Sequence, residues 1–150
     1  MSHRFTSLFT HLIFSTKDRK PFLDEELAPQ CRAYIGGIIE NIGSRRIEIG
    51  GVSDHVHILL DLGATMALSD CVRAIKSNSS KWVHEKWPER WRFQWQKGYA
   101  AFSVSRSSVD RVIAYIRNQE THHHRMTYQD EVRTLLRQHG LECDERYMWE

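Results

Sequence analysis

Cysteine, proline and glycine are scarce in this chain of 150 residues, which holds 3 Cys, 3 Pro and 8 Gly. The cysteines are far apart and form no Cys-x-x-Cys pair, which argues against a disulfide framework or a zinc ribbon and favours a reducing compartment. So few glycines and prolines exclude collagen-like and low-complexity sequence. Long apolar runs are also missing, because the uncharged stretch over 5–16 contains a histidine and several hydroxyl groups. We therefore expect a cytoplasmic protein with no membrane partner.

Charge of one sign is not in excess either. Lys and Arg total 21 against 19 Asp and Glu, a formal net charge of +2. A polyanionic partner would therefore need a local basic patch rather than bulk charge. The length, with 41% hydrophobic residues, fits one compact domain over residues 1–150.

Hydrophobic periodicity predicts an α+β fold. Strands are expected over 5–15, 46–52, 55–62 and 93–105. Helices are expected over 27–42, from Leu68 to a point before Pro88, from Ser107 through the segment around Tyr115, and from Thr127 to Gly140. The order β-α-β-β-α-β with further helices is a ferredoxin-like or RRM-like split βαβ arrangement, in which two helices cover one face of an antiparallel sheet. A tyrosine-bearing helix then follows toward the C-terminus.

Two histidines alternate along the third predicted strand. Since a strand has a period of two residues, His55 and His57 point to one side, and Val56, Ile58 and Leu60 point to the other, toward the helices. This strand is central in the predicted topology, so we expect two neighbouring imidazoles on the uncovered face of the sheet. Imidazole is a common ligand of divalent metals. An exposed polar strand face without a metal is the alternative interpretation of the same tripeptide.

A tyrosine and an amide share one face of the third predicted helix. Tyr115 and Gln119 are four residues apart and therefore stack on one face. His122 clusters with them and is a further candidate site residue, as a ligand or a proton carrier. His123 falls close to the apolar stripe, where a packed or structural role is expected, and His124 is expected in solvent. A half-buried core tyrosine is the alternative interpretation of Tyr115.

Residues 76–97 combine basic side chains with four of the five tryptophans. Together with Arg73, the basic residues that we expect to contact DNA are Lys76, Lys81, Lys86, Arg90, Arg92 and Lys97. The tryptophans are Trp82, Trp87, Trp91 and Trp95. Interleaved cations and indoles suit a single-stranded nucleic acid, whose phosphates are neutralised and whose unpaired bases stack. Alternatively, some of these tryptophans anchor the second helix to the core.

In combination these motifs resemble the single-tyrosine HUH transposases of bacterial insertion sequences and their REP-associated relatives. The resemblance rests on the His55-Val56-His57 strand, the Trp-Gln-Lys-Gly-Tyr run over 95–99 and the helix that carries Tyr115 and Gln119. It covers nearly the whole chain, and the motifs occur in the family order. The run from Thr127 onward is more similar to the REP-associated branch.

The resemblance implies a metal-dependent transposase of single-stranded DNA. In the family the two HUH histidines, here His55 and His57, bind Mg²⁺ or Mn²⁺ with the glutamine that corresponds to Gln119. The tyrosine, here Tyr115, is the nucleophile and forms a 5′-phosphotyrosine intermediate, so that strands are cleaved and rejoined without ATP. The substrate is single-stranded DNA with a hairpin. Family members are homodimers in which the tyrosine helix of one subunit completes the histidine pair of the other, and the sequence does not choose between assembly in cis and in trans.

Three alternatives remain open at the level of the sequence. An RRM-like module would bind single-stranded nucleic acid without catalysis, and a hydrolytic metal nuclease would use water as the nucleophile. A domesticated REP-associated enzyme would act on chromosomal repeat hairpins with the same chemistry as the transposase.

Overall fold

The centre of the molecule is a four-stranded antiparallel sheet with the order β2-β3-β1-β4. The strands are β1 (Phe9–Ser15), β2 (Arg45–Val52), β3 (His55–Asp61) and β4 (Ala100–Ser103). The computed structural model describes residues 4–123 and 125–150, so the expectation for His124 lies outside the described residues. β2 and β3 form the predicted hairpin, in which Val52 pairs with His55. β3 is an interior strand of the sheet, as predicted.

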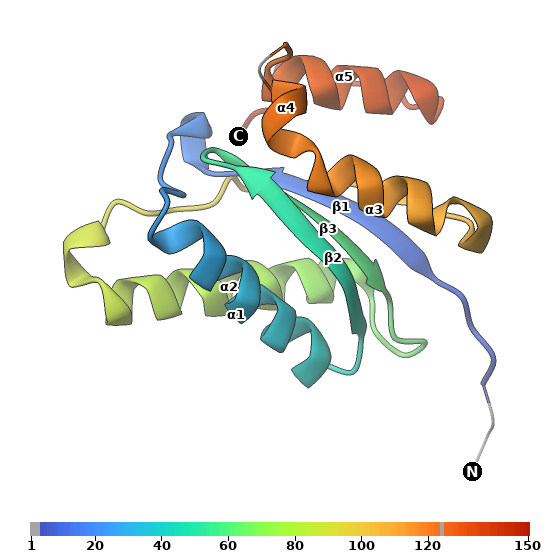
Figure 1. Cartoon of the computed structure of the whole chain (residues 1–150), viewed down its shortest axis with the longest axis horizontal. Coiled ribbons are helices and arrows are strands. Elements are labelled where there is room, and N and C mark those ends of the chain that lie inside the picture. The colour runs from blue at the N-terminus through green and yellow to red at the C-terminus, as the bar shows by residue number, and fades with distance from the viewer. Residues whose placement is uncertain (1–3, 124) are drawn as a thin grey trace.

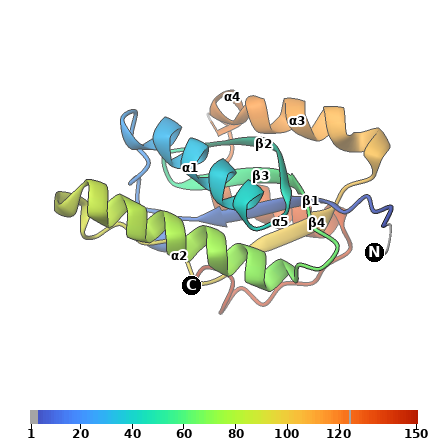
Figure 2. The same cartoon turned by 90° about the horizontal axis from the view of Figure 1, so that it is seen from below.

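Helices cover both faces of this sheet (Figure 1). On one face lie α1 (Leu27–Asn41) and α2 (Leu68–Lys86), the two helices that the split βαβ pattern predicts. On the other lie α3 (Val109–Arg117), α4 (Gln119–His123) and α5 (Tyr128–Gln138). Figure 2 shows the same layers from below. The sheet separates the pair α1 and α2 from the group α3, α4 and α5. The predicted α+β class is confirmed, but the expectation of an uncovered second face is wrong, because the C-terminal helices fold back onto it.

The alternation of side chains along β1 and β3 assigns residues to the two faces. Leu12, Phe14, Val56, Ile58 and Leu60 pack with α1 and α2 in the largest hydrophobic cluster. The intervening residues face α3, α4 and α5, where smaller apolar clusters surround a set of buried polar groups. A fully buried aliphatic or aromatic side chain contributes roughly 1.5–3 kcal/mol, so the first face supplies most of the hydrophobic stabilisation.

Three predicted elements are shorter or more broken in the structure. β1 begins at Phe9, and Phe5 is 97% exposed, since the first residues of the predicted strand have no partner strand. β4 covers only Ala100–Ser103; upstream of it, Phe93 and Trp95 are buried as part of a loop rather than a strand. The third predicted helix is interrupted at Asn118, whose backbone (φ −95°, ψ 18°) is not helical, so Gln119 begins a separate short helix.

The three cysteines are free and differ in exposure. Cys31 and Cys71 are buried between α1, α2 and the sheet, and Cys143 is exposed in the segment after α5. Burial raises the pKa of the Cys31 thiol to about 12 and that of Cys71 to about 11. Within residues 4–123 and 125–150, every helix is too short or too polar to cross a bilayer.

Candidate functional site

β3 presents His55 and His57 to the α3–α5 side of the sheet, and both side chains are fully buried. Their Nδ1 atoms are engaged away from the site: His55 Nδ1 lies 2.7 Å from Asp54 Oδ1, and His57 Nδ1 lies 2.8 Å from His11 Nε2. Such contacts to the second ring nitrogen orient an imidazole and fix its tautomer. Both Nε2 atoms therefore face the space beneath the C-terminal helices.

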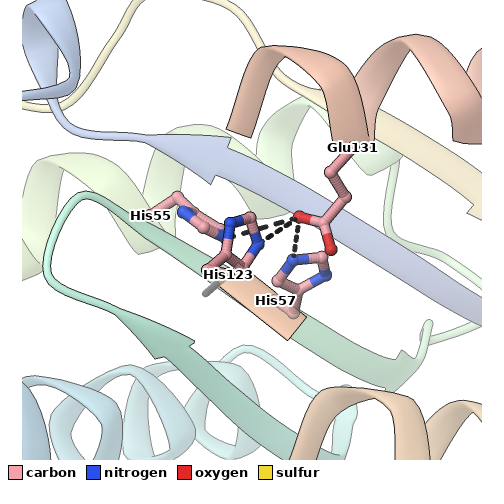
Figure 3. A group of neighbouring side chains, drawn as sticks. All are labelled: His55, His57, His123 and Glu131. Atoms are coloured by element: carbon pink, nitrogen blue, oxygen red, sulfur yellow. Dashed lines mark hydrogen bonds and ion pairs between the residues drawn. The ribbon is translucent and has the colours of Figure 1, made fainter. Parts of the chain in front are cut away.

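α5 fills that space with Glu131, a residue that the sequence reasoning missed. Its Oε1 atom lies 2.9 Å from His57 Nε2, 3.4 Å from His55 Nε2 and 3.0 Å from His123 Nε2. Figure 3 shows the three imidazoles converging on this one carboxylate oxygen. The side chain of Glu131 is only 1% exposed. A signal was present in the sequence, because Glu131 lies between Tyr128 and Val132 on the apolar, core-facing side of an amphipathic helix.

The other carboxylate oxygen of Glu131 faces the tyrosine helix. Tyr115 donates its hydroxyl hydrogen to Oε2, and Gln119 Nε2 donates to the same oxygen at 3.2 Å. His122 Nε2 lies 3.4 Å from Oε2 and 3.5 Å from the Tyr115 hydroxyl. Gln119 Oε1 in turn lies 3.2 Å from His55 Nε2. One chain thus brings together the five candidate site residues of the HUH strand and the tyrosine helix. It also adds His123, for which only a packing role was expected.

A glycine in β2 allows α3 to approach the sheet closely enough for this network. A Cβ atom at Gly50 would lie 2.8 Å from both Ile116 Cγ2 and the Ile116 carbonyl oxygen. Ile116 is buried in the cluster between α3 and the sheet and directly follows Tyr115. The missing side chain at Gly50 therefore sets the height of the tyrosine above the sheet.

The buried charges of the site are strongly coupled. Burial alone would raise the pKa of Glu131, but hydrogen bonds from His123, His55 and His57 hold it far below its usual range. Burial lowers the pKa of His55, yet the hydrogen bonds with Asp54 and Glu131 outweigh it and raise the pKa to about 9. His57 lacks the second carboxylate, and burial lowers its pKa to about 4.

The nucleophile candidate and the outer histidine are also shifted. Burial, followed by the adjacent Glu131 carboxylate, raises the pKa of the Tyr115 hydroxyl well above its usual range, so the phenol is protonated. Burial and the neighbouring His57 lower the pKa of His11 to about 3.

The donor atoms of this cluster suit a divalent cation. One ligand atom from each of His55, His57, His123 and Glu131 lies within 4.8 Å of every other. Imidazole nitrogen and carboxylate or amide oxygen together accommodate Mn²⁺ and related divalent metals. The residues present therefore fit a metal site, and they do not by themselves identify the metal.

The basic stretch lies apart from this cluster, on α2 and the loop that follows it. Its two less exposed cations are held by several contacts within the protein. Lys76 Nζ donates to the carbonyl oxygens of Gln96, Lys97 and Gly98, and Arg90 pairs with Asp24 and Glu26. The exposed basic side chains are Arg73, Lys81, Lys86, Arg92 and Lys97.

The four tryptophans of the stretch divide unevenly between core and surface. Trp87 and Trp95 are buried, and Trp82 stacks on Tyr34 with ring centroids 4.5 Å apart. Trp91 is 67% exposed, with the Arg92 guanidinium 4.6 Å from its ring centroid. Anchoring of α2 therefore accounts for most of these indoles, and Trp91 is available for stacking.

Comparison with known proteins agrees with this fold. The family described as Transposase IS200 like matches residues 4–119. The chain belongs to this family of transposases, which implies DNA strand-transfer chemistry. The match ends at Gln119, so α5 and Glu131 lie outside it.

Curated relatives include the ISDra2 transposase TnpA of Deinococcus radiodurans, 28% identical over 114 residues that cover 73% of this chain and 81% of that protein. The transposase for insertion sequence element IS200 of Salmonella typhimurium is 27% identical over 118 residues, which cover 73% and 74% of the two chains. The resemblance inferred from the sequence is therefore confirmed at the level of the family.

Solved structures agree on the fold. A crystal structure from Deinococcus radiodurans, described as that of a transposase, superposes with a TM-score of 0.65 at 26% identity and covers 79% of this chain and 95% of its own. A REP-associated tyrosine transposase bound to a REP hairpin gives a TM-score of 0.60 at 14% identity, over 82% and 74% of the two chains. The second likeness supports the architecture alone.

Proposed function

We propose that this protein is a metal-dependent transposase that binds single-stranded DNA with a hairpin and cleaves and rejoins it through a 5′-phosphotyrosine at Tyr115. The observation that supports this most directly is the continuous buried network within one chain. It runs from the Tyr115 hydroxyl through Glu131 to the Nε2 atoms of His55 and His57. Neither a half-buried core tyrosine nor an exposed strand face accounts for such a network.

The metal ligands in this proposal are His55, His57 and Gln119, and the metal is Mg²⁺ or Mn²⁺. When bound, the cation polarises the scissile phosphate and stabilises the negative charge that develops in the transition state. The chain supplies the preorganisation: Asp54 and His11 orient the two imidazoles, and the sheet excludes water from behind them.

Tyr115 supplies the nucleophile. Its phenolic oxygen forms a bond to the phosphorus while the bond between phosphorus and the 3′ oxygen breaks, and the leaving oxygen becomes a free 3′-hydroxyl. Because no water enters, the phosphotyrosine ester can be attacked by another 3′-hydroxyl in the reverse sense, which rejoins strands. His122, close to the Tyr115 hydroxyl, is a further site residue for proton movement in this proposal.

DNA reaches the tyrosine along a groove of about 750 Å³ whose lining includes Tyr115, His11, Ser105 and Arg111. Serine hydroxyls and an arginine guanidinium are suitable partners for the phosphates that flank the scissile bond. The exposed cations of the basic stretch, with Trp91, would hold a more distant part of the strand.

The site is assembled in cis in this proposal, since the Tyr115 ring centroid lies 5.7 Å from that of His57 in the same chain. A homodimer, which the family resemblance implies, stays a prediction that light scattering can test. Mobile-element and domesticated REP-associated functions share this chemistry and differ in which hairpins are cut.

The test is to incubate the protein with Mn²⁺ or Mg²⁺ and a labelled single-stranded hairpin oligonucleotide taken from beside its own gene. A denaturing gel and mass spectrometry should reveal a DNA-linked peptide that contains Tyr115, is absent in EDTA and is absent from Tyr115→Phe. Cleavage without an adduct would favour the hydrolytic nuclease, and binding without cleavage would favour the RRM-like module.

A further inference from the structure

Glu131 is a buried acid whose carboxylate contacts three histidine nitrogens, atoms that commonly bind metals. It comes from α5, beyond the region that the family match covers, and it is buried against three imidazoles. Its Oε1 atom accepts from His57 at 2.9 Å and His123 at 3.0 Å, and it lies 3.4 Å from His55 Nε2. All three neighbours of this oxygen are Nε2 atoms, the ring nitrogens that face the site.

These separations resemble those between neighbouring ligands of a single ion. Two ligands at right angles around a cation, each ~2.1 Å from it, are about 3 Å apart, and opposite ligands are ~4.2 Å apart. The cluster formed by His55, His57, His123 and Glu131 has no pair of ligand atoms farther apart than 4.8 Å. A small shift of the Glu131 side chain away from the imidazoles would leave room for a cation among them.

The charge of the ligand set gives a second reason. His55, His57 and Gln119 are neutral as ligands, whereas Mg²⁺ and Mn²⁺ are hard cations that are normally held by at least one carboxylate. Among the described residues, Glu131 is the one acid in the cluster whose carboxylate can approach such a cation beside His55 and His57. Without it, a divalent charge in this buried pocket would lack a protein counter-charge at contact distance.

The second oxygen of Glu131 links the same group to the nucleophile. Oε2 accepts from the Tyr115 hydroxyl and from Gln119 Nε2. A carboxylate that holds the cation with one oxygen and the phenol with the other would fix the distance between them.

We propose that Glu131 is a ligand of the divalent cation, supplied by α5 in addition to His55, His57 and Gln119, and that its second oxygen positions Tyr115. This inference rests on the proposed function and extends it to a residue outside the family match. The competing role is structural: Glu131 would only accept hydrogen bonds from the histidines and hold α5 on the sheet.

Mn²⁺ binding by the full chain separates the two roles. We would measure it by calorimetry and by electron paramagnetic resonance of free Mn²⁺ for the wild type, for Glu131→Gln, and for Asp130→Asn. Glutamine keeps the size of the side chain and an acceptor oxygen, but it removes the negative charge. Asp130→Asn makes the same acid-to-amide change one residue earlier on α5, where the side chain is exposed and paired with Arg133.

We expect Glu131→Gln to weaken Mn²⁺ binding at least ~10-fold and Asp130→Asn to change it less than ~2-fold. Equal Mn²⁺ affinity in wild type and Glu131→Gln would overturn the ligand role. If wild-type protein still forms the Tyr115 adduct in that case, the proposed function stands and only this inference fails. If wild-type protein binds no Mn²⁺, both fail.

A measurement on the wild type covers the case in which Glu131→Gln does not fold. Water-proton relaxation counts the exchangeable waters on bound Mn²⁺. Four protein ligands on a six-coordinate ion leave about two waters, whereas three leave about three. Three waters would contradict Glu131 as a ligand. Two waters in the wild type and also in His123→Gln would support it, because His123 is then not the fourth ligand.

Discussion

The two faces of the sheet have interiors of opposite character. The face under α1 and α2 is filled almost wholly by aliphatic and aromatic side chains. The face under α3, α4 and α5 buries His11, His55, His57, Gln119 and Glu131 between smaller apolar clusters.

The difference separates what stabilises the fold from what performs chemistry. Buried polar groups cost free energy unless they are hydrogen-bonded. In the described part of the chain every buried side-chain nitrogen or oxygen has a partner, so the second face avoids most of that penalty. The second face thereby forms a low-dielectric pocket in which histidines, a carboxylate and a phenol interact strongly.

The largest expected effect tests whether the second face of a single chain forms a complete active site. Tyr115→Phe and His57→Ala should each reduce adduct formation by at least about 1000-fold, since each removes a group that the other groups require. Mixing the two variants should not restore it, because the structure brings Tyr115 to the histidines of its own chain. Adduct formation by the mixture, measured on a denaturing gel, would mean that the site is assembled between subunits.

The first face should affect stability without affecting chemistry. Ile75 of α2 is fully buried in the core cluster, and Ile75→Ala should lower the free energy of unfolding by roughly 2–5 kcal/mol in urea titrations. Adduct formation per folded molecule should stay within about 3-fold of the wild type at low temperature. Loss of activity in the folded variant would show that the two faces are coupled.

Gly50 tests how closely the second face depends on its packing distance. Gly50→Ala places a methyl group 2.8 Å from Ile116 and should cost roughly 1–3 kcal/mol of stability. Because α3 carries Tyr115, the rate of adduct formation should fall in molecules that remain folded. Gly37→Ala is the matched control, since a Cβ there meets nothing within 4 Å and alanine favours a helix. An unchanged rate in folded Gly50→Ala would contradict the packing argument.

Acid should destabilise the second face selectively in metal-free protein. Burial lowers the pKa of His11 to about 3 and of His57 to about 4, so both are neutral when folded and protonate in the unfolded chain below pH ~6.5. Stability should therefore fall as the pH drops from 6.5 toward 4.5, by up to ~1.4 kcal/mol per pH unit for each group. His55, with its pKa raised to about 9, has the opposite sign, and its contribution is lost between about pH 6.5 and 9.

Urea titrations at several pH values give the free energy of unfolding as a function of pH. In His11→Gln the slope of this curve below pH 6.5 should correspond to about one fewer proton taken up on unfolding. An unaltered slope in His11→Gln would mean that His11 is protonated in the folded protein.

The smallest expected effect tests whether the helical layer on the first face also contacts DNA, since its outer surface carries the basic stretch. Arg92→Ala should weaken hairpin binding and reduce the slope of log affinity against log salt by about one, as expected for a single phosphate contact. Arg45→Ala, which removes an exposed cation of β2, should leave that slope unchanged. If both variants behave as wild type, the DNA path avoids α2 and its loop.

Local pattern was sufficient to predict the strands, the two covering helices and the direction of the paired histidines. A period of two residues fixes the side to which His55 and His57 point, whatever lies there. The pattern was not sufficient for what covers them, because α5 contacts β3 across more than seventy residues of chain. Glu131 looked like an ordinary acid in the first turn of a helix, and only tertiary packing places it among the imidazoles.

The tryptophans show the opposite failure of sequence reasoning, in which residues that look like ligand contacts belong to the core. Composition suggested a row of stacking surfaces, but burial of Trp87 and Trp95 depends on how α2 and its loop fold onto the sheet. Lys76 likewise looked like a cation for phosphate, and it instead holds the loop through three backbone carbonyl groups. Charge and aromaticity in a sequence do not distinguish a surface that meets a ligand from one that meets the rest of the protein.

The distribution of the cysteines provides a built-in reporter position. Cys31 and Cys71 are buried, with pKa values that keep their thiols protonated, and Cys143 is exposed just beyond α5. A maleimide fluorophore should therefore label the folded wild-type chain at Cys143 alone, without any engineered mutation. The label would sit on the segment that follows the helix carrying Glu131, so its emission would follow any displacement of α5 when Mn²⁺ or a DNA hairpin is added.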